Sequence, residues 1–284
     1  MRASIYTLVA MFAFAGNSII CRLALVDGSI DPGSFTYIRL AAGAITLLLT
    51  LKLRSGDVSV REHGSWVSAA LLFLYAICFS YAYVDLSTGT GALILFGCVQ
   101  ATMIVMALRS GDRPHRTEWL GWFLAGCGFV WLLLPGVSAP SLQGSLLMAI
   151  AGIGWGIYSV RGKRESEPLA STASNFARTL IPVTIAAIVA TTSLGTSHWS
   201  SNGVALAVLS GGLTSGIGYV IWYAALRYLK SMQAALVQLS VPAIAALGGV
   251  LLVAEAPSLR LVLSGLLVLG GISIALAGKS GAGR

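Results

Sequence analysis

The sequence predicts an all-α integral membrane protein with ten transmembrane helices in two inverted five-helix repeats. Of its 284 residues, 56% are hydrophobic and only 10% are charged, whereas about a quarter of the residues in a soluble domain are charged. The apolar residues form ten runs of span length, and the cations gather in alternate connections between them. This composition excludes soluble enzymes, nucleic-acid-binding proteins and disulfide-stabilised secreted domains, because the solvent must be lipid.

The ten apolar runs cover nearly the whole chain and leave no room for an extramembrane domain. A helix needs about 20 apolar residues to cross the hydrocarbon core. The first run is too long for the apolar part of a signal peptide, so we count it as a span. The expected spans are residues 4–25, 33–53, 65–84, 88–108, 117–134, 142–160, 171–192, 203–226, 232–254 and 258–277.

The distribution of Lys and Arg predicts the orientation. Fourteen of the 18 cations fall at one set of span ends and only Arg260 falls at the other. The remaining three, Arg22, Arg39 and Arg178, lie inside spans. Because Lys and Arg are retained on the cytoplasmic side, we expect a multi-pass protein of a bacterial-type inner (plasma) membrane with both termini in the cytoplasm.

Residues 1–136 and 137–284 are predicted to be two copies of one five-helix unit. Matching positions recur in order at offsets of 139 to 142 residues: Tyr37-Ile38-Arg39 with Phe176-Ala177-Arg178, Gly16 with Gly156, Tyr81-Ala82 with Tyr223-Ala224, and Ala92 with Ala234. Because each unit has an odd number of spans, the second unit enters the membrane from the opposite side. In transporters built this way, the substrate binds near the midplane and the halves rock around it.

Several motifs carry a family resemblance over nearly the whole chain. They are Arg39 and Arg178, the Trp155-Gly156 pair, Pro242, and the Glu255-Ala256-Pro257 turn before the last span. Together with the ten spans, they resemble the EamA-type ten-helix members of the drug/metabolite transporter (DMT) superfamily, most closely the YddG-type aromatic amino acid exporters. The first repeat departs from this pattern, with Ala15-Gly16 in place of Trp-Gly, Gln100 at the position of Pro242, and Asp112 near that of Glu255.

The resemblance implies export of amino acids, aromatic or other apolar ones, or of similar small metabolites by alternating access. Export of another metabolite or drug class within the superfamily is the alternative. A membrane-embedded enzyme or a non-transporting sensor is a more distant alternative. The implied partners are a small amino-acid-like substrate and the lipid bilayer, and we expect a monomer.

Polar and aromatic side chains inside the spans predict a midplane pocket. Polar atoms at that depth should face a protein interior or a wet cavity rather than lipid. Aromatic walls would hold an apolar side chain, and amides and hydroxyls would hold a polar head. Alternatively, the amides join neighbouring helices and the rings simply pack. The expected substrate-binding residues are Asn17, Tyr75, Phe79, Phe96, Gln100, Trp155, Ser159, Gln238 and Ser240.

Two arginines inside spans are predicted to have structural or gating roles. Arg39 and Arg178 lie roughly 10 to 12 Å from a span end by helix rise. A buried cation costs about 2.5 to 3.5 kcal/mol, so each needs a partner. We favour helix carbonyls or carboxylates at span ends over direct contact with the substrate. The candidate carboxylates are Asp27, Asp31, Asp85 and Glu255 for Arg39, and Glu165 and Glu167 for Arg178.

Gly212, Gly216 and Pro242 are also expected to have structural or gating roles. Gly212 and Gly216 lie in a run of poor helix formers at 211–218, which should soften the backbone of the eighth span. Tight packing of these glycines is the alternative interpretation. Pro242 should free a carbonyl about one turn earlier in the ninth span.

The sequence offers no catalytic or metal site and implies no cofactor. His63, His115 and His198 fall in connections, and the four cysteines lie in apolar runs without metal-ligand spacing. All ten Asp and Glu residues lie at span ends or in loops. By resemblance, proton-coupled relatives use a buried carboxylate where this chain has Asn17, which does not titrate. We therefore expect downhill transport that is insensitive to voltage.

Overall fold

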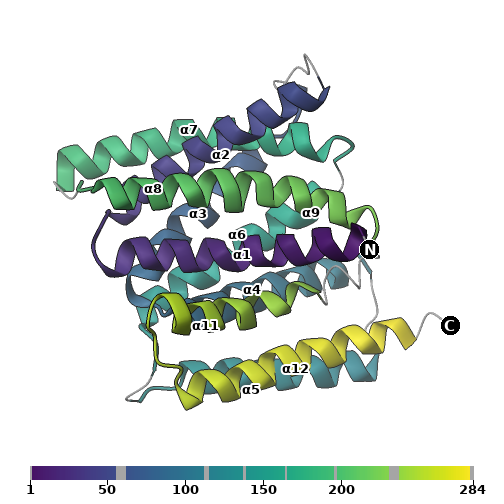
Figure 1. The fold of residues 1–284 in the computed structure, drawn as a ribbon. Helices are drawn as coiled ribbons and strands as arrows, with labels where there is room; N and C mark the ends of the chain where they lie inside the picture. Colours follow the sequence, from purple (N-terminus) through teal and green to yellow (C-terminus); the bar gives the residue numbers. More distant parts are fainter. Residues whose placement is uncertain are drawn as a thin grey trace.

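The all-α architecture is confirmed by the computed structural model, which describes residues 2–55, 62–111, 115–136, 139–163, 165–194, 197–229 and 237–281. The helical segments within these ranges group into ten rods, and Figure 1 shows how the rods are arranged. The first five are α1 (Arg2–Val26), α2 (Pro32–Ser55), α3 (Trp66–Asp85), α4 (Thr88–Arg109) and α5 (Arg116–Leu133). Three of the others are single helices: α6 (Leu142–Gly162), α11 (Ser240–Leu252) and α12 (Leu259–Gly281). The seventh rod consists of α7 (Pro168–Val189) and the π-helix η2 (Ala190–Leu194). The eighth rod consists of α8 (Ser201–Leu209), the π-helix η3 (Ser210–Ile217) and α9 (Gly218–Leu226).

Eight of the described rods are long and apolar enough to cross a membrane. The other two are α5, with 18 residues, and α11, with 13. The first residues of the expected ninth span, 232–236, lie outside the described part of the chain, as do Asp112 and the boundary residue 137. The start of α1 and the end of α12 lie at the same end of the bundle, as an even number of crossings requires (Figure 1).

Short polar residues start several of these helices. Ser65, Ser141 and Ser200 precede α3, α6 and α8, and each side chain accepts a hydrogen bond from a backbone N–H of the first turn. These bonds satisfy donors that have no partner within a helix. Pro168 occupies the first turn of α7, where its missing N–H costs nothing. The helix boundaries therefore follow from local sequence as well as from hydropathy.

The outer surface of the bundle is apolar, as contact with lipid requires. Leu53, Phe123 and Leu266 expose 86%, 68% and 68% of their surface. In water, apolar patches of this kind would promote association. In a bilayer, the same side chains contact acyl chains.

The rods are stacked in layers between two edge pairs (Figure 1). α2 packs against α7 at one edge, and α5 packs against α12 at the other. Glycines make the second contact close, because a Cβ at Gly121 would collide with the carbonyl of Gly271. The remaining helices lie between these pairs and surround the centre of the molecule.

Helix contacts in the first half have counterparts in the second. α3 packs against α6, and the α8–η3–α9 rod packs against α1. Likewise, α4 packs against α6, and α11 packs against α1. This exchange of partners agrees with two five-helix repeats related by a twofold axis. The repeat boundary between residues 136 and 137 stays a prediction.

The structure describes both places where the sequence predicts an irregular helix backbone, the run 211–218 and Pro242. The glycine-rich run lies in η3, whose π-helical pattern interrupts the regular helix between α8 and α9. Gly212 and Gly216 lie against Thr46 of α2, while a Cβ on Gly211 would collide with the carbonyl oxygen of Arg39. Pro242 is the third residue of α11 rather than an interior residue. It is tolerated there because the first turn of a helix has no partner for its N–H groups.

Candidate substrate-binding pocket

A pocket lies at the centre of the bundle, enclosed by α1, α3, α4, α6, η3 and α9. Its volume is about 20 Å³, enough for roughly one water molecule, whereas pockets that bind small molecules usually measure about 300 to 1,000 Å³. The pocket is therefore too small in this conformation to hold a small-molecule substrate. The residues that line it are Phe14, Asn17, Ser18, Tyr75, Phe79, Leu95, Phe96, Trp155, Thr214, Ser215 and Tyr219.

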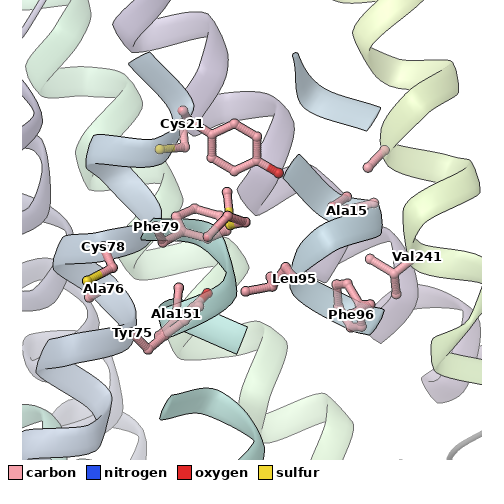
Figure 2. Close-up of a cluster of buried hydrophobic side chains, with 14 of the residues drawn as sticks. Ala15, Cys21, Tyr75, Ala76, Cys78, Phe79, Leu95, Phe96, Ala151 and Val241 are labelled. Carbon is pink, nitrogen blue, oxygen red and sulfur yellow. The ribbon is translucent and has the colours of Figure 1, made fainter. Parts of the chain in front are cut away.

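Aromatic rings from several helices form most of the wall. The ring of Trp155 stacks on Tyr219, with centroids 5.1 Å apart, and tilts against Tyr75 at 4.9 Å. Phe14 approaches Tyr219 at 5.9 Å. Figure 2 shows Tyr75 and Phe79 of α3 on one side of Leu95 of α4, and Phe96 of α4 on the other side, beside Val241 of α11. Since centroid separations of 4.5 to 7 Å are favourable, the rings form a continuous apolar surface around the polar groups.

A hydrogen-bond network joins the two halves of the chain through Asn17. Its side-chain amide donates to the Tyr75 hydroxyl at 3.3 Å, and its carbonyl oxygen accepts from the hydroxyls of Ser210 at 2.7 Å and Thr214 at 3.4 Å. Asn17 is 6% exposed. The network therefore links α1 and α3 of the first half to η3 of the second within the pocket wall.

Arg39 lies behind this wall and is 2% exposed. Its Nη2 donates to the Tyr75 hydroxyl at 3.0 Å and its Nε donates to the Ser215 hydroxyl at 3.3 Å. The guanidinium carbon lies 4.9 Å from the ring centroid of Phe79 and 5.3 Å from that of Tyr75. All three neighbours line the pocket, so one layer of side chains separates the cation from the cavity.

The prediction that Arg39 pairs with a carboxylate at a span end is wrong. Among the described residues it forms no ion pair, and its Nη1 has no hydrogen-bond partner. Glu255 pairs with Arg22 instead, at 3.0 Å. Asp31 accepts from the backbone N–H groups of Ser34 and His198. The guanidinium lies too deep in the bundle for carboxylates that already serve the helix ends.

Arg178 occupies a different environment, near the start of α3. Its Nη1 donates to the carbonyl of His63 at 2.9 Å, and its guanidinium lies 5.7 Å from the ring centroid of Trp66. A backbone carbonyl is thus one of its partners, although it belongs to the connection before α3 rather than to a helix. The two matched arginines therefore contact different kinds of group.

The pocket brings together five of the nine predicted binding residues: Asn17, Tyr75, Phe79, Phe96 and Trp155. The other four lie outside its lining, and their contact with a substrate stays a prediction. Gln100 is buried, with no hydrogen-bond partner for its Nε2 among the described residues, and Gln238 is half-buried. The hydroxyls of Ser159 and Ser240 donate to the carbonyls of Trp155 and Val237.

Six lining residues were not predicted: Phe14, Ser18, Leu95, Thr214, Ser215 and Tyr219. Phe14 lies three residues before Asn17, and Ser18 lies four residues after Phe14, so each pair shares one face of α1. This spacing could have identified Phe14 and Ser18. The poor helix formers of the run 211–218 predict only a softened backbone and do not identify its side chains as part of the pocket.

A second polar cluster closes the bundle at the end that the cation distribution predicts to be external. The Arg22–Glu255 pair joins α1 to the connection between α11 and α12. Arg22 also donates to the carbonyls of Tyr83 and Val84 at 2.8 and 2.7 Å, and Glu255 accepts from the backbone N–H of Thr88 at 2.8 Å. The Arg22–Glu255 pair therefore links α1, the end of α3, the start of α4 and the connection between α11 and α12.

The comparisons with known proteins agree with this architecture. Residues 142–277 match the model of the EamA-like transporter family. An uncharacterized protein of Pseudomonas aeruginosa is 48% identical over 280 residues, covering 99% of this chain and 96% of that protein. An uncharacterized transporter of Archaeoglobus fulgidus is 25% identical over 95% of both chains, and the uncharacterized transporter YoaV of Bacillus subtilis is 23% identical over 86% of both. A crystal structure at 19% identity shares the fold, with a TM-score of 0.68 over 98% of both chains. The EamA-like match of residues 142–277 and the two relatives named as transporters support membership of the drug/metabolite transporter superfamily.

Proposed function

We propose that this transporter exports amino acids, aromatic or other apolar ones, or similar small metabolites across the inner membrane. The observation that carries the proposal is the composition of the pocket. Six of its lining residues are aromatic, and the others include an amide and several hydroxyls. Such a wall suits a ligand with an apolar body and a small polar head.

Alternating access is the proposed mechanism. A pocket of about 20 Å³ admits no amino acid, so binding requires the helices around it to separate. The Arg22–Glu255 cluster joins both halves at one end, and its rupture would open that end. At the other end, Arg161 of α6 donates to the hydroxyls of Ser65 and Ser68. Opening the two ends in turn would carry the substrate through the pocket.

Export by a monomer with both termini in the cytoplasm is the proposed arrangement. The orientation rests on the 14 cations at one set of span ends against one at the other. A cysteine at Ser197 should then react with an impermeant thiol reagent applied outside intact cells, and a cysteine at Ser166 should not. The reverse labelling pattern would show that both termini lie outside the cytoplasm.

Counterflow in proteoliposomes tests the proposed substrate class. Vesicles that contain the purified protein are loaded with unlabelled L-phenylalanine and diluted into labelled L-phenylalanine. We expect transient accumulation of label that protein-free vesicles do not show. Tryptophan and leucine in the external medium should reduce it, whereas aspartate and lysine should not. Absence of counterflow with phenylalanine, tryptophan and leucine would refute export of this class.

A further inference from the structure

Arg39 is a buried cation without an opposite charge among the residues that the structure describes. Its guanidinium contacts two hydroxyls and two aromatic rings, and its Nη1 has no hydrogen-bond partner. Hydroxyls and ring faces compensate a full charge poorly, and an unpaired buried charge is costly. A group kept in this state requires an anion from elsewhere.

The other arginines that lie inside the bundle are better provided with partners. Arg22 contacts the carboxylate of Glu255 and two backbone carbonyls. Arg178 contacts the carbonyl of His63. The carbonyls that accept from Arg22 lie in the last turn of α3, where a helix leaves acceptors free, and the carbonyl that accepts from Arg178 lies just before α3. Arg39 lies beside the pocket, where the described residues supply no acceptor for Nη1.

The pocket contains no acidic residue among those that line it. Tyr75, Phe79 and Ser215 belong to its wall and also contact Arg39. When the helices separate to admit a substrate, displacement of these side chains would uncover the guanidinium. The site would then present one positive charge and a set of aromatic rings, without a negative charge to oppose an anion.

We propose that Arg39 binds the carboxylate of the transported molecule, so that the site requires a carboxylate on an apolar body. The inference rests on the proposed function and narrows it. A carboxylate can accept two parallel hydrogen bonds from a guanidinium. The ammonium group of an amino acid would meet only ring faces and neutral acceptors, which give a weaker interaction. The carboxylate is therefore essential for binding, and the ammonium group is not.

Ligand-induced thermal stabilisation of the purified protein in detergent tests this requirement without transport. The probes are L-phenylalanine, 3-phenylpropionate and 2-phenylethylamine, which share one aromatic body and differ in their charged groups. We expect both carboxylates to stabilise the native protein and the amine to leave it unchanged. Stabilisation by the amine to the same extent, or by neither carboxylate, would overturn the proposal. Sodium chloride alone serves as a further probe, and stabilisation by chloride equal to that by the carboxylates would assign Arg39 to an inorganic anion instead.

Arg39→Met tests the residue itself, with Arg260→Met as the matched control, because Arg260 lies in the first turn of α12, outside the pocket lining, and donates to the carbonyl of Leu134. Methionine keeps the length of the apolar stem and removes the charge, so the ligand-free variant should be at least as stable as the native protein. The concentration of 3-phenylpropionate needed for half-maximal stabilisation should rise at least about tenfold in Arg39→Met and stay unchanged in Arg260→Met. An unchanged value in Arg39→Met would refute the assignment. If Arg39→Met does not fold, the comparison of the three probes on the native protein decides.

The outcomes separate this inference from the proposed function. Counterflow of phenylalanine that persists in Arg39→Met would leave amino acid export standing and remove Arg39 from the site. Binding of 3-phenylpropionate that depends on Arg39, without counterflow of phenylalanine, would keep the carboxylate site and remove amino acid export.

Discussion

At the residue scale, Trp155 is the side chain that connects the aromatic wall of the pocket. Its ring centroid lies 4.9 Å from that of Tyr75, 5.1 Å from Tyr219 and 5.4 Å from Tyr158. It therefore bridges α3, α6 and α9. A side chain in this position can stack on a ligand and also hold the neighbouring rings in place.

We predict that Trp155→Ala lowers counterflow by more than about tenfold, since each aromatic pair contributes about 0.5 to 1.5 kcal/mol and 1.4 kcal/mol corresponds to a factor of ten. The loss of transport should be much larger than the fall in its thermal midpoint would explain. Trp122→Ala is the matched control, because Trp122 packs on Trp119 in α5, away from the pocket. A proportional loss of stability and transport in Trp155→Ala would favour simple packing.

The sequence predicted one side of the pocket better than the other. Asn17, Tyr75 and Trp155 interrupt apolar runs with polar or aromatic groups, which marks them as buried features of a membrane helix. Tyr219 follows a glycine-rich run whose conformation is π-helical, and regular helical spacing is a poor guide there. The partners of Arg39 could not be predicted, because Tyr75 and Ser215 come from helices that only the tertiary fold brings together.

At the element scale, η3 is the irregular segment that brings the eighth rod close to α2. Gly211 faces the Arg39 carbonyl, and Gly216 faces the side chain of Thr46. Glycine permits this approach because it has no Cβ. The sequence predicted an irregular backbone here from its poor helix formers, but the choice of a π-helix depends on packing against α2.

We predict that Gly211→Ala destabilises the protein by about 1 to 3 kcal/mol, because the added methyl group meets backbone that cannot rotate away. Gly265→Ala in α12 is the control, since nothing lies within 4 Å of a Cβ at that position. It should stabilise the protein by up to about 1 kcal/mol through helix propensity. Thermal unfolding in detergent measures both. Equal stability of the two variants would show that the close contact of η3 with α2 is wrong.

The link between α1 and the α11–α12 connection also belongs to this scale. We predict that Glu255→Gln and Arg22→Met each lower the free energy of unfolding by about 1.5 to 3 kcal/mol, as loss of hydrogen bonds to a charged group does. The double variant should lose less than the sum of the two, since the groups contact each other. Asp85→Asn changes the carboxylate that accepts a hydrogen bond from the Ser141 hydroxyl. It should lower the free energy of unfolding by less than either of these single variants. Strictly additive losses would argue against a direct pair.

At the scale of the whole molecule, the bundle separates an apolar exterior from a small polar centre. The span boundaries predicted from hydropathy lie close to those of the described helices, because the length of an apolar run is set by the bilayer and is visible in sequence. The stacking of the rods depends on glycine contacts and ring packing between distant segments, which hydropathy does not encode.

We predict downhill transport that does not respond to membrane potential for a zwitterionic amino acid. The pocket lining contains Asn17 but no Asp or Glu, and a substrate of zero net charge avoids the term of about 2.3 kcal/mol per charge per 100 mV. Proteoliposomes with an imposed pH gradient or a potassium–valinomycin potential measure this. Sustained accumulation of phenylalanine above its external concentration would show active coupling.

Substrate protection of a cysteine in the pocket tests most directly whether the substrate passes through it. Thr214 lines the pocket and is 5% exposed, and Thr214→Cys places a thiol there in a background without other cysteines. A small thiol reagent should abolish counterflow of phenylalanine, and saturating phenylalanine should slow the labelling at least about tenfold. A cysteine at Ser197 should be labelled at the same rate with and without phenylalanine. Labelling of Thr214→Cys that leaves counterflow intact and is not slowed by phenylalanine would show that the transport path lies elsewhere.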